Sequence, residues 1–345
     1  MTVRTLIVDD SASMQAVIRR KLDADPMIEV VGTASSADEA RAQIKALDPD
    51  VVTLDVEMPG MNGLEFLERL MRLRPTPVVM LSTLTSHGAE VSLTALELGA
   101  FDCFDKAALP LAVDPTGAPG LADLIRAAAQ SRPAATGRRE IVSYRHAEPE
   151  AFRAKPRSMI AIGASTGGVE TLIALLTDFP ANCPPTVIVQ HMPTSFTASF
   201  AARLDRLCPP RVEEARAGAP LVAGTVYLAP GGDRHLEIAG AGDKRHCRLV
   251  EGDKVSGHRP SVDRLFHSVA RLARADAVGV ILTGMGGDGA EGLKAMRDAG
   301  SVTIGQDKAT CVVYGMPAVA HRIGAVSEQQ PLGRIAARLI AECRA

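Results

Sequence analysis

The stretch Thr5-Leu6-Ile7-Val8-Asp9-Asp10-Ser11 places a short apolar run directly before two carboxylates and a hydroxyl. The apolar run has the length of a buried strand, and residues 13–24 after it have the spacing of an amphipathic helix. This alternation occurs five times before residue 131. Strands are predicted at Thr5–Val8, Glu29–Thr33, Val51–Leu54, Pro77–Leu81 and Phe101–Phe104, and helices at 13–24, 37–47, 63–73, 88–98 and 119–130. The pattern predicts a doubly wound α/β fold with a parallel sheet.

A second α/β series begins after residue 157. Met159–Gly163 is an apolar run typical of a strand, and Ser165-Thr166-Gly167-Gly168 opens a helix. Further strands are predicted at Thr186–Gln190 and Ala277–Leu282, with Gly224–Leu228 and His235–Ile238 as a hairpin or as edge strands. We therefore expect a second doubly wound, mainly parallel α/β domain.

The segment between the two series has the composition of a linker. A chain of 345 residues suits two domains better than one. From Ser131 to Arg157, three prolines interrupt the pattern and seven Lys and Arg residues make it basic. Almost no aromatic residues stand between these charges, which favours a solvated linker over a nucleic-acid-binding arm. The predicted organisation is a domain over 1–130, a linker over 131–156 and a domain over 157–345.

Composition excludes several classes of protein. The net charge of −2 argues against a general nucleic-acid or membrane-surface role. No apolar run reaches the roughly 20 residues that span a bilayer, and Asp9 and Asp10 end the first apolar run too early for a secretory signal. The six cysteines are scattered without a CxxC pair, so neither a disulfide framework nor a zinc cluster is indicated. We expect a soluble cytoplasmic protein that neither inserts into membranes nor binds nucleic acid.

Charged and polar side chains follow the predicted strands of the first domain. Asp9 and Asp10 end the first strand, Asp55 the third and Ser82 the fourth, and Lys106 follows the fifth. Ligands of an open parallel sheet bind beyond the carboxyl ends of its strands. Carboxylates that converge there repel one another unless a hard cation such as Mg²⁺ joins them. An Asp after a strand is often only a helix cap, but a whole set at strand ends indicates a phosphoryl-transfer site.

Four segments of the first domain resemble the receiver domain of bacterial two-component response regulators. They are LIVDDS (6–11), DVEMPGMNG (55–63), Val79–Ser82 and Gly99–Lys106. The resemblance covers about residues 3–130 and implies a flavodoxin-like (βα)5 fold. It implies the following site residues: Asp55 as phosphoacceptor; Asp10, Asp55 and the backbone carbonyl of Glu57 as Mg²⁺ ligands; Asp9 in the outer shell; and Ser82 and Lys106 as the switch residues that contact the phosphoryl group. Cys103 stands where this family usually has an aromatic residue, and Ala107 where it has proline.

A nucleophile is predicted at the first strand-to-helix junction of the second domain. Residues 163–168 read GASTGG, and these small residues allow a sharp turn that leaves Ser165 near free N–H groups of a helix N-terminus. This suits a nucleophile whose product is an oxyanion, and it equally suits a phosphate cradle. His191 ends the strand 186–190 and Asp288 lies beyond the strand 277–282. Ser165, His191 and Asp288 can therefore form an acyl-transfer triad.

Other interpretations of these residues remain open from spacing alone. A lone His is more often packed or at the surface, and an Asp in a glycine-rich loop is more often a turn former. The GMGGDG at 284–289 also invites a dinucleotide- or phosphate-binding interpretation. Against that rival, no GxGxxG follows a strand together with a suitable ribose-binding acid.

Six segments of the second domain resemble the chemotaxis response regulator protein-glutamate methylesterase/protein-glutamine glutaminase family, CheB. They are GASTGG (163–168), QHMPTSFTASFAARLD (190–205), YLAPGGDRHLEI (227–238), GHRPSVDRLFHSVA (257–270), GVILTGMGGDGAEGL (279–293) and QDKATCVVYGMP (306–317). The resemblance implies that Ser165, His191 and Asp288 are the triad. It also implies that Thr166 is an active-site neighbour and that the backbone N–H of Met285 helps to bind the oxyanion. Gly287 replaces the commoner asparagine of this loop.

The resemblance implies a phosphorylation-activated hydrolase. Its implied reactions are hydrolysis of glutamate γ-methyl esters, which releases methanol, and deamidation of particular glutamines. The implied substrates are methyl-accepting chemotaxis receptors, and the phosphodonor is the chemotaxis histidine kinase. Mg²⁺ serves receiver phosphorylation, and ester hydrolysis needs no cofactor. The alternative is a response regulator with a non-enzymatic output domain, which is disfavoured because residues 157–345 show no helix-turn-helix pattern.

Overall fold

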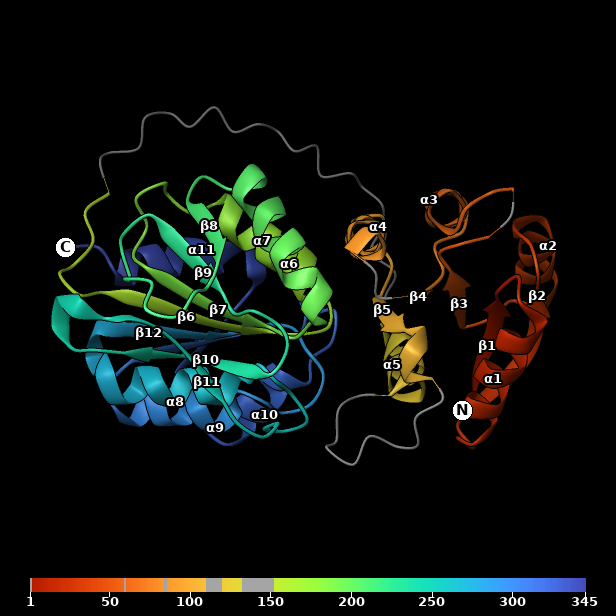
Figure 1. Ribbon diagram of the computed structural model, residues 1–345. Coiled ribbons are helices and arrows are strands. Elements are labelled where there is room, and N and C mark those ends of the chain that lie inside the picture. The colour runs from red at the N-terminus through yellow and green to blue at the C-terminus, as the bar shows by residue number, and fades with distance from the viewer. Residues whose placement is uncertain (1, 59, 84–85, 110–119, 132–151) are drawn as a thin grey trace. The chain divides into compact units, whose positions relative to one another are not determined.

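The computed structural model describes residues 2–58, 60–83, 86–109, 120–131 and 152–345. The chain divides into two compact units, Met1–Tyr144 and Arg145–Ala345. Each unit has its own sheet of parallel strands flanked by helices (Figure 1). The α/β fold predicted for both halves of the chain is confirmed.

The first unit is a five-stranded parallel sheet in the order β2-β1-β3-β4-β5. Its strands are β1 (Val3–Val8), β2 (Ile28–Ala34), β3 (Val51–Asp55), β4 (Val78–Ser82) and β5 (Asp102–Asp105). Its helices are α1 (Ala12–Asp23), α2 (Ala37–Leu47), α3 (Gly63–Leu73), α4 (Ser86–Glu97) and α5 (Leu121–Gln130). Every residue of β3 and β4 is buried, as expected for strands that helices cover on both faces.

Capping side chains explain where three of these helices begin. Ser11, Ser36 and Asn62 each accept a hydrogen bond from a backbone N–H in the first turn of α1, α2 and α3. Helices α2 and α3 begin and end at the predicted residues, and the other elements lie within about two residues of their predictions. Because β1 and β3 are neighbours, the residues that end these two strands reach the same edge of the sheet.

The second unit contains a seven-stranded sheet in the order β14-β13-β12-β6-β7-β9-β8, in which all neighbouring strands are parallel. Its strands are β6 (Met159–Ala164), β7 (Thr186–Gln190), β8 (Arg211–Glu214), β9 (Thr225–Leu228), β12 (Ala277–Ile281), β13 (Val302–Gln306) and β14 (Glu328–Gln330). Its helices are α6 (Gly168–Thr177), α7 (Thr194–Leu207), α8 (Val262–Leu272), α9 (Ala290–Asp298), α10 (Met316–Arg322) and α11 (Leu332–Glu342). Helices α6, α7 and α11 cover one face, and α8, α9 and α10 the other (Figure 1).

Gly224–Leu228 and His235–Ile238, predicted as a hairpin or as edge strands, do not pair with each other, and the first is not an edge strand. The first segment is β9, which lies inside the main sheet between β7 and β8 and is buried along its whole length. The second segment is β10 (Arg234–Ala239), which forms an antiparallel hairpin with β11 (His246–Glu251). Strand β11 was not predicted because its alternating residues face solvent on one side and its sequence, HCRLVE, is rich in charge.

The chain order of the second sheet creates a switch point beside β6. From β6 the chain continues to β7 on one side, and it later returns to β12 on the other side. Ligands of doubly wound sheets bind at such a point, beyond the carboxyl ends of the strands. The loops that follow β6, β7 and β12 therefore meet where a site is expected.

Of the predicted linker, residues 132–151 lie outside the described residues. Residues 152–156 contact the second unit. Phe152 is buried, Ala154 forms an antiparallel bridge with Arg344, and the N–H of Lys155 donates to the carbonyl of Cys343 at 2.7 Å. These contacts join the start of the second unit to its last residues, so residues 152–156 belong with that unit; the other predicted domain limits stay predictions.

Close packing at β6 predicts the effect of one substitution. A Cβ at Gly163 would lie 2.2 Å from Cγ1 of Val262, so Gly163→Ala should destabilise the second unit by about 1–3 kcal/mol through overpacking. Gly333→Ala, in helix α11, is the matched control, because its Cβ would meet no atom within 4 Å. It should be neutral or stabilising by up to about 1 kcal/mol. Urea unfolding of both variants measures this, and equal midpoints would contradict the packing argument.

Candidate functional site

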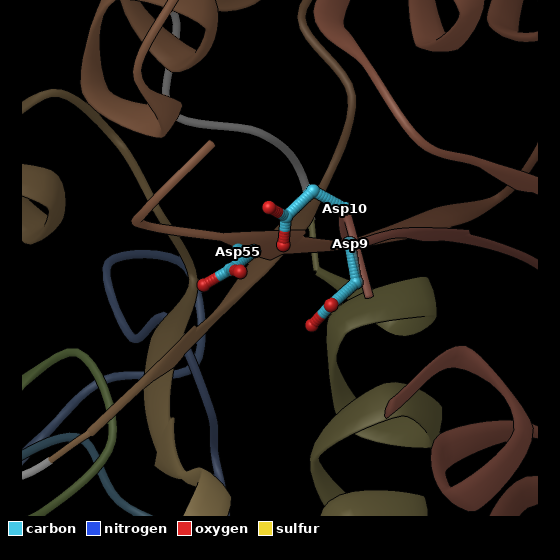
Figure 2. A group of neighbouring side chains, drawn as sticks. All are labelled: Asp9, Asp10 and Asp55. Atoms are coloured by element: carbon cyan, nitrogen blue, oxygen red, sulfur yellow. The ribbon is translucent and has the colours of Figure 1, made fainter. Parts of the chain in front are cut away.

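Three carboxylates converge at the carboxyl edge of the first sheet. Asp9 and Asp10 follow β1, and Asp55 ends β3 (Figure 2). One ligand oxygen from each lies within 4.8 Å of the other two. Asp9 and Asp55 are buried, whereas Asp10 is exposed. The predicted cluster is therefore present in the structure, with one carboxylate open to an incoming ligand.

Lys106 joins the two buried carboxylates. Its Nζ lies 2.8 Å from Oδ2 of Asp9 and 2.7 Å from Oδ2 of Asp55. Burial raises the pKa of Asp55, and the bond to Lys106 opposes this rise. Burial works against the charge of Lys106, but its two carboxylate partners outweigh burial and raise the pKa of the ammonium. One positive charge thus faces three acidic side chains, which leaves the cluster suited to a further cation.

A cavity of about 600 Å³ opens onto this cluster and is lined by Asp10, Asp55, Glu57, Ser82 and Lys106 among others. Oxygen donors of this kind, three of them carboxylates, are what Mg²⁺ prefers. Ser82 is buried, and its hydroxyl donates to the carbonyl of Thr83 at 3.2 Å. The cluster is consistent with Mg²⁺ binding.

Cys103 occupies the position that is usually aromatic in receiver domains. Its thiol donates to the carbonyl of Ser92 on α4 at 3.6 Å, and burial raises the pKa of the thiol. Ala107, at the usual proline position, donates its N–H to Oδ1 of Asp105 at 2.9 Å. A proline has no N–H to make this bond, so here the chain after β5 is held by a hydrogen bond instead of a ring.

Strand register places Ser165 and His191 on neighbouring strand ends at the switch point of the second sheet. Ala164 and Gln190 are paired on β6 and β7, so Ser165 and His191 are the next residues along two adjacent strands. The N–H of Ser165 donates to the carbonyl of Thr283, in the loop after β12, at 3.0 Å. That same loop leads to Asp288. Ser165 is 8% exposed, which leaves it accessible only from one side.

Asp288 binds both His191 and the N-terminus of α8. Its Oδ2 lies 2.8 Å from Nε2 of His191 and accepts from the N–H of Val262 at 2.7 Å. Its Oδ1 accepts from the hydroxyl of Ser261 at 2.8 Å. Burial opposes ionisation of Asp288, but the bond from His191 and the donors at α8 outweigh burial and lower the pKa of the carboxyl. Asp288 is thus held as a carboxylate.

The hydrogen bond between Asp288 and His191 decides which ring nitrogen of a neutral His191 carries the hydrogen. A carboxylate only accepts, so the hydrogen of the neutral ring is on Nε2. The Nδ1 atom is buried and has no hydrogen-bond partner within the described part of the chain. A second imidazole, His258, stacks on the ring with centroids 3.6 Å apart and planes within 5°. The ring is therefore fixed in its plane with a free acceptor nitrogen.

Two backbone N–H groups of the described residues are free to donate hydrogen bonds to an oxyanion. Across the described ranges, the N–H groups of Thr166 and Met285 have no hydrogen-bond acceptor. Thr166 follows the nucleophile candidate, and its carbonyl accepts from the hydroxyl of Thr283 at 3.0 Å. Thr283 also accepts from the N–H of Val313, so this hydroxyl clamps two loops around the site. Fixed donors of this kind are suited to stabilise developing negative charge.

Sequence reasoning missed His258, Ser261 and His235 as site residues. His235 is fully buried; its Nε2 donates to the carbonyl of Asp253 at 2.9 Å, and its Nδ1 accepts from the N–H of Ser261 at 3.1 Å. His235 therefore holds the residue whose hydroxyl binds Asp288. All three lie in the segments 227–238 and 257–270, which carried the family resemblance, but nothing in their local pattern gives their roles.

Comparisons with known proteins identify the families of the two units. A family model described as CheB methylesterase matches residues 160–339, and one described as response regulator receiver domain matches residues 5–111. The protein-glutamate methylesterase/protein-glutamine glutaminase of Agrobacterium fabrum is 58% identical over 98% of this chain and 95% of its own length. The protein-glutamate methylesterase/protein-glutamine glutaminase 1 of Caulobacter vibrioides is 55% identical over 96% of this chain and 95% of its own length.

A solved structure also matches the second unit. The crystal structure of the Thermotoga maritima CheB methylesterase catalytic domain aligns with a TM-score of 0.52 at 39% identity, covering 53% of this chain and 97% of that one. These matches favour an enzymatic output over the non-enzymatic alternative. The chain therefore belongs to the CheB methylesterase family and joins a response regulator receiver domain to a methylesterase domain.

Proposed function

We propose that this protein is a phosphorylation-regulated protein-glutamate methylesterase and protein-glutamine glutaminase, with Ser165, His191 and Asp288 as its triad. The observation that carries the proposal is the 2.8 Å bond between Asp288 and Nε2 of His191, which leaves Nδ1 of His191 free. His191 directly follows β7, and Ser165 directly follows the neighbouring strand β6. The names of the relatives support the same reaction.

In the first step the hydroxyl oxygen of Ser165 attacks the ester carbonyl carbon, and Nδ1 of His191 takes the hydroxyl proton. Asp288 stabilises the imidazolium that forms. The oxyanion accepts hydrogen bonds from the N–H groups of Thr166 and Met285. The imidazolium then returns its proton to the leaving oxygen, and methanol departs from the acyl-enzyme.

In the second step water attacks the acyl-enzyme, and the same histidine removes a proton from that water. The products are glutamate and free Ser165. A glutamine side chain follows the same path with ammonia as the leaving group, so one serine serves both reactions. No cofactor is required by this route.

Phosphorylation of the receiver domain controls the esterase activity. A carboxylate oxygen of Asp55 attacks the phosphorus of the donor and the donor's bond to phosphorus breaks, while Lys106 and Ser82 bind phosphoryl oxygens. Mg²⁺, held by Asp10, Asp55 and the carbonyl of Glu57 with Asp9 behind them, would neutralise charge on the phosphoryl group. The convergence of the three carboxylates supports this assignment.

The proposed partners are methyl-accepting chemotaxis receptors as substrates and the chemotaxis histidine kinase as phosphodonor, with both reactions in the cytoplasm. Among the described residues, no helix is long and apolar enough to cross a bilayer. The direct test of substrate is methanol release from methylated receptor incubated with the pure protein. Release that stays at the level of a protein-free control would contradict the proposed activity.

We expect the unphosphorylated receiver to inhibit the esterase by covering it. A closed state favoured by about 1.4 kcal/mol would hold roughly nine-tenths of the molecules inactive, so removing the receiver should raise the rate at most about tenfold. The test is a fragment of residues 152–345, which keeps the contacts of Phe152 and Lys155 with the second unit. Its methanol release is compared with that of the unphosphorylated full chain.

A full chain phosphorylated by a small donor is the positive control, and it should approach the rate of the fragment. A fragment that is folded but no faster than the full chain would reject inhibition by coverage. Receptor recruitment would then be the role of the receiver to test next.

A further inference from the structure

In the second unit, the N-termini of α8 and α9 each donate hydrogen bonds to a carboxylate that lies on or just before the other helix. Asp288, in the loop before α9, accepts from the N–H groups of Val262 (2.7 Å) and Asp263 (3.1 Å), in the first turn of α8. Asp263 in return accepts from the N–H of Gly292 (2.7 Å), in the first turn of α9. Each carboxylate therefore lies where unpaired N–H groups and the helix dipole favour negative charge.

The two side chains are buried together. Asp263 is 7% exposed and Asp288 is 1% exposed, and their side chains contact each other. Gly292 permits the close approach of α9 to α8, since a Cβ there would lie 2.8 Å from the carbonyl oxygen of Asp263. Two buried carboxylates in contact repel when both are ionised, so the pair titrates as a coupled unit.

Their surroundings push the two pKa values apart. Burial raises the pKa of Asp263 to about 6, and the charge of Asp288 adds to the rise while the N–H of Gly292 opposes it. For Asp288, burial works against the charge, but His191 and the donors of α8 outweigh burial and lower the pKa. The proton that this pair takes up in mildly acidic solution therefore resides on Asp263.

Other charges on the same helices are engaged elsewhere. On α8, Arg264 lies 2.7 Å from Glu237 of β10. On α9, Lys294 pairs with Asp298, and Glu291 acts on His267 of α8. Asp263 itself meets the backbone N–H groups of α9 and the carboxylate of Asp288, behind which His191 lies at the end of β7.

We propose that Asp263 is a positioning residue of the esterase site: its carboxylate fixes the loop that carries Asp288, and its ionisation strengthens the hold of Asp288 on the His191 imidazolium. The inference deepens the proposed triad function and rests on it. When ionised, Asp263 adds a second negative charge behind Asp288. When protonated, its O–H donates to Asp288, competes with His191 for the same carboxylate and removes that charge.

The experiment uses the full chain and its Asp263→Asn variant. Asparagine keeps the shape and can still accept from Gly292, but it never ionises. The readout is the rate at which an uncharged phosphonofluoridate modifies Ser165, followed by intact mass from pH 5 to 9. This rate reports the reactivity of Ser165 whether or not a glutamate ester is the natural substrate. Methanol release from methylated receptor is measured in parallel.

The ratio of wild-type to Asp263→Asn modification rates should be about 1 near pH 5, where the side chain at position 263 is largely uncharged in wild type and uncharged in the variant. It should rise through about pH 6 to roughly five- to tenfold above pH 7. A ratio that does not change with pH, whatever its size, would overturn the proposal and leave a purely structural role. Normal labelling without methanol release would instead count against the proposed substrate alone.

A measurement on the wild type needs no variant. The amide proton of Gly292 donates to Asp263, so its NMR shift reports ionisation of that carboxyl. We expect a titration centred near pH 6, and a shift that is constant from pH 5 to 7 would overturn the proposal. Asp298→Asn is the matched control, because Asp298 is a solvent-exposed carboxylate at the far end of α9, the helix whose first turn donates to Asp263, and it should leave the rate and its pH dependence unchanged.

Discussion

Ser165→Ala should lower the rate of ester hydrolysis by about four to six orders of magnitude. In the proposed mechanism the variant loses the atom that forms the acyl-enzyme, and only substrate binding and oxyanion stabilisation remain to act on an attacking water. The fold should survive, since the contacts of Ser165 with Thr283 and Gly168 use its backbone. Methanol release from methylated receptor gives the rate, and intact mass after phosphonofluoridate treatment shows whether any other residue is modified.

The matched control is Ser301→Ala, a buried serine at the opposite, amino end of β13 whose hydroxyl donates to the carbonyl of Arg274. It should cost stability of about 1 kcal/mol and leave the rate unchanged. Cysteines are poor substitutes for the nucleophile, because burial raises the pKa of Cys208 to about 11 and of Cys311 to about 12. Ser165→Ala that still releases methanol at a near-normal rate would refute the mechanism.

The strands and helices of the first unit could be predicted almost to the residue because each strand is a short apolar run followed by a polar residue. Thr53 and Leu54 of β3 are both fully buried, so the run reads as a central strand regardless of which face a residue takes. Helix α2 is marked by Ser36 before its first residue and by Asp48, in the left-handed conformation, after its last. Local chemistry decides both limits.

Pairing between strands of the second unit could not be predicted in the same way. The segment TVYL at 225–228 is compatible with a hairpin, an edge or a central strand, and only its burial between β7 and β8 decides. Its tyrosine illustrates the difficulty. The ring of Tyr227 is buried, while its hydroxyl donates to the carbonyl of Pro220 at 2.6 Å, a contact with the loop before β9 that no periodicity encodes.

For the candidate site, the sequence pointed to residues that end strands and missed residues that support them. Ser165, His191 and Asp288 stand out because a polar residue directly after an apolar strand has a known location at the sheet edge. Ser261 and Asp263 do not stand out, because they lie at the start of a helix, where Ser and Asp are ordinary capping residues. Their importance arises because the N-terminus of α8 lies against Asp288, which is a fact of tertiary packing.

Asp55→Asn should abolish phosphorylation of the receiver by a small donor such as acetyl phosphate. Asparagine keeps the size of the side chain and can still accept from the N–H of Glu57, as Oδ1 of Asp55 does at 3.2 Å, but its amide oxygen does not displace the leaving group from phosphorus. Incorporation of radiolabelled phosphoryl group into the full chain measures the effect. The same loss is expected for the wild type when Mg²⁺ is removed by a chelator, because the carboxylates would then repel the anionic donor.

Asp38→Asn separates this effect from a general change of charge. Asp38 is an exposed carboxylate in the first turn of α2, away from the cavity lined by Asp10, Asp55 and Lys106, so its substitution should leave labelling intact. Lys106→Met should lower labelling in the presence of Mg²⁺ less than Asp55→Asn does, since the lysine binds the phosphoryl group and does not accept it. Labelling of Asp55→Asn at the wild-type rate would show that another residue accepts the phosphoryl group. Control of the esterase would then have to be sought at that residue, because Lys106 contacts Asp9 and Asp55 and would not be the group that binds a phosphoryl group placed elsewhere.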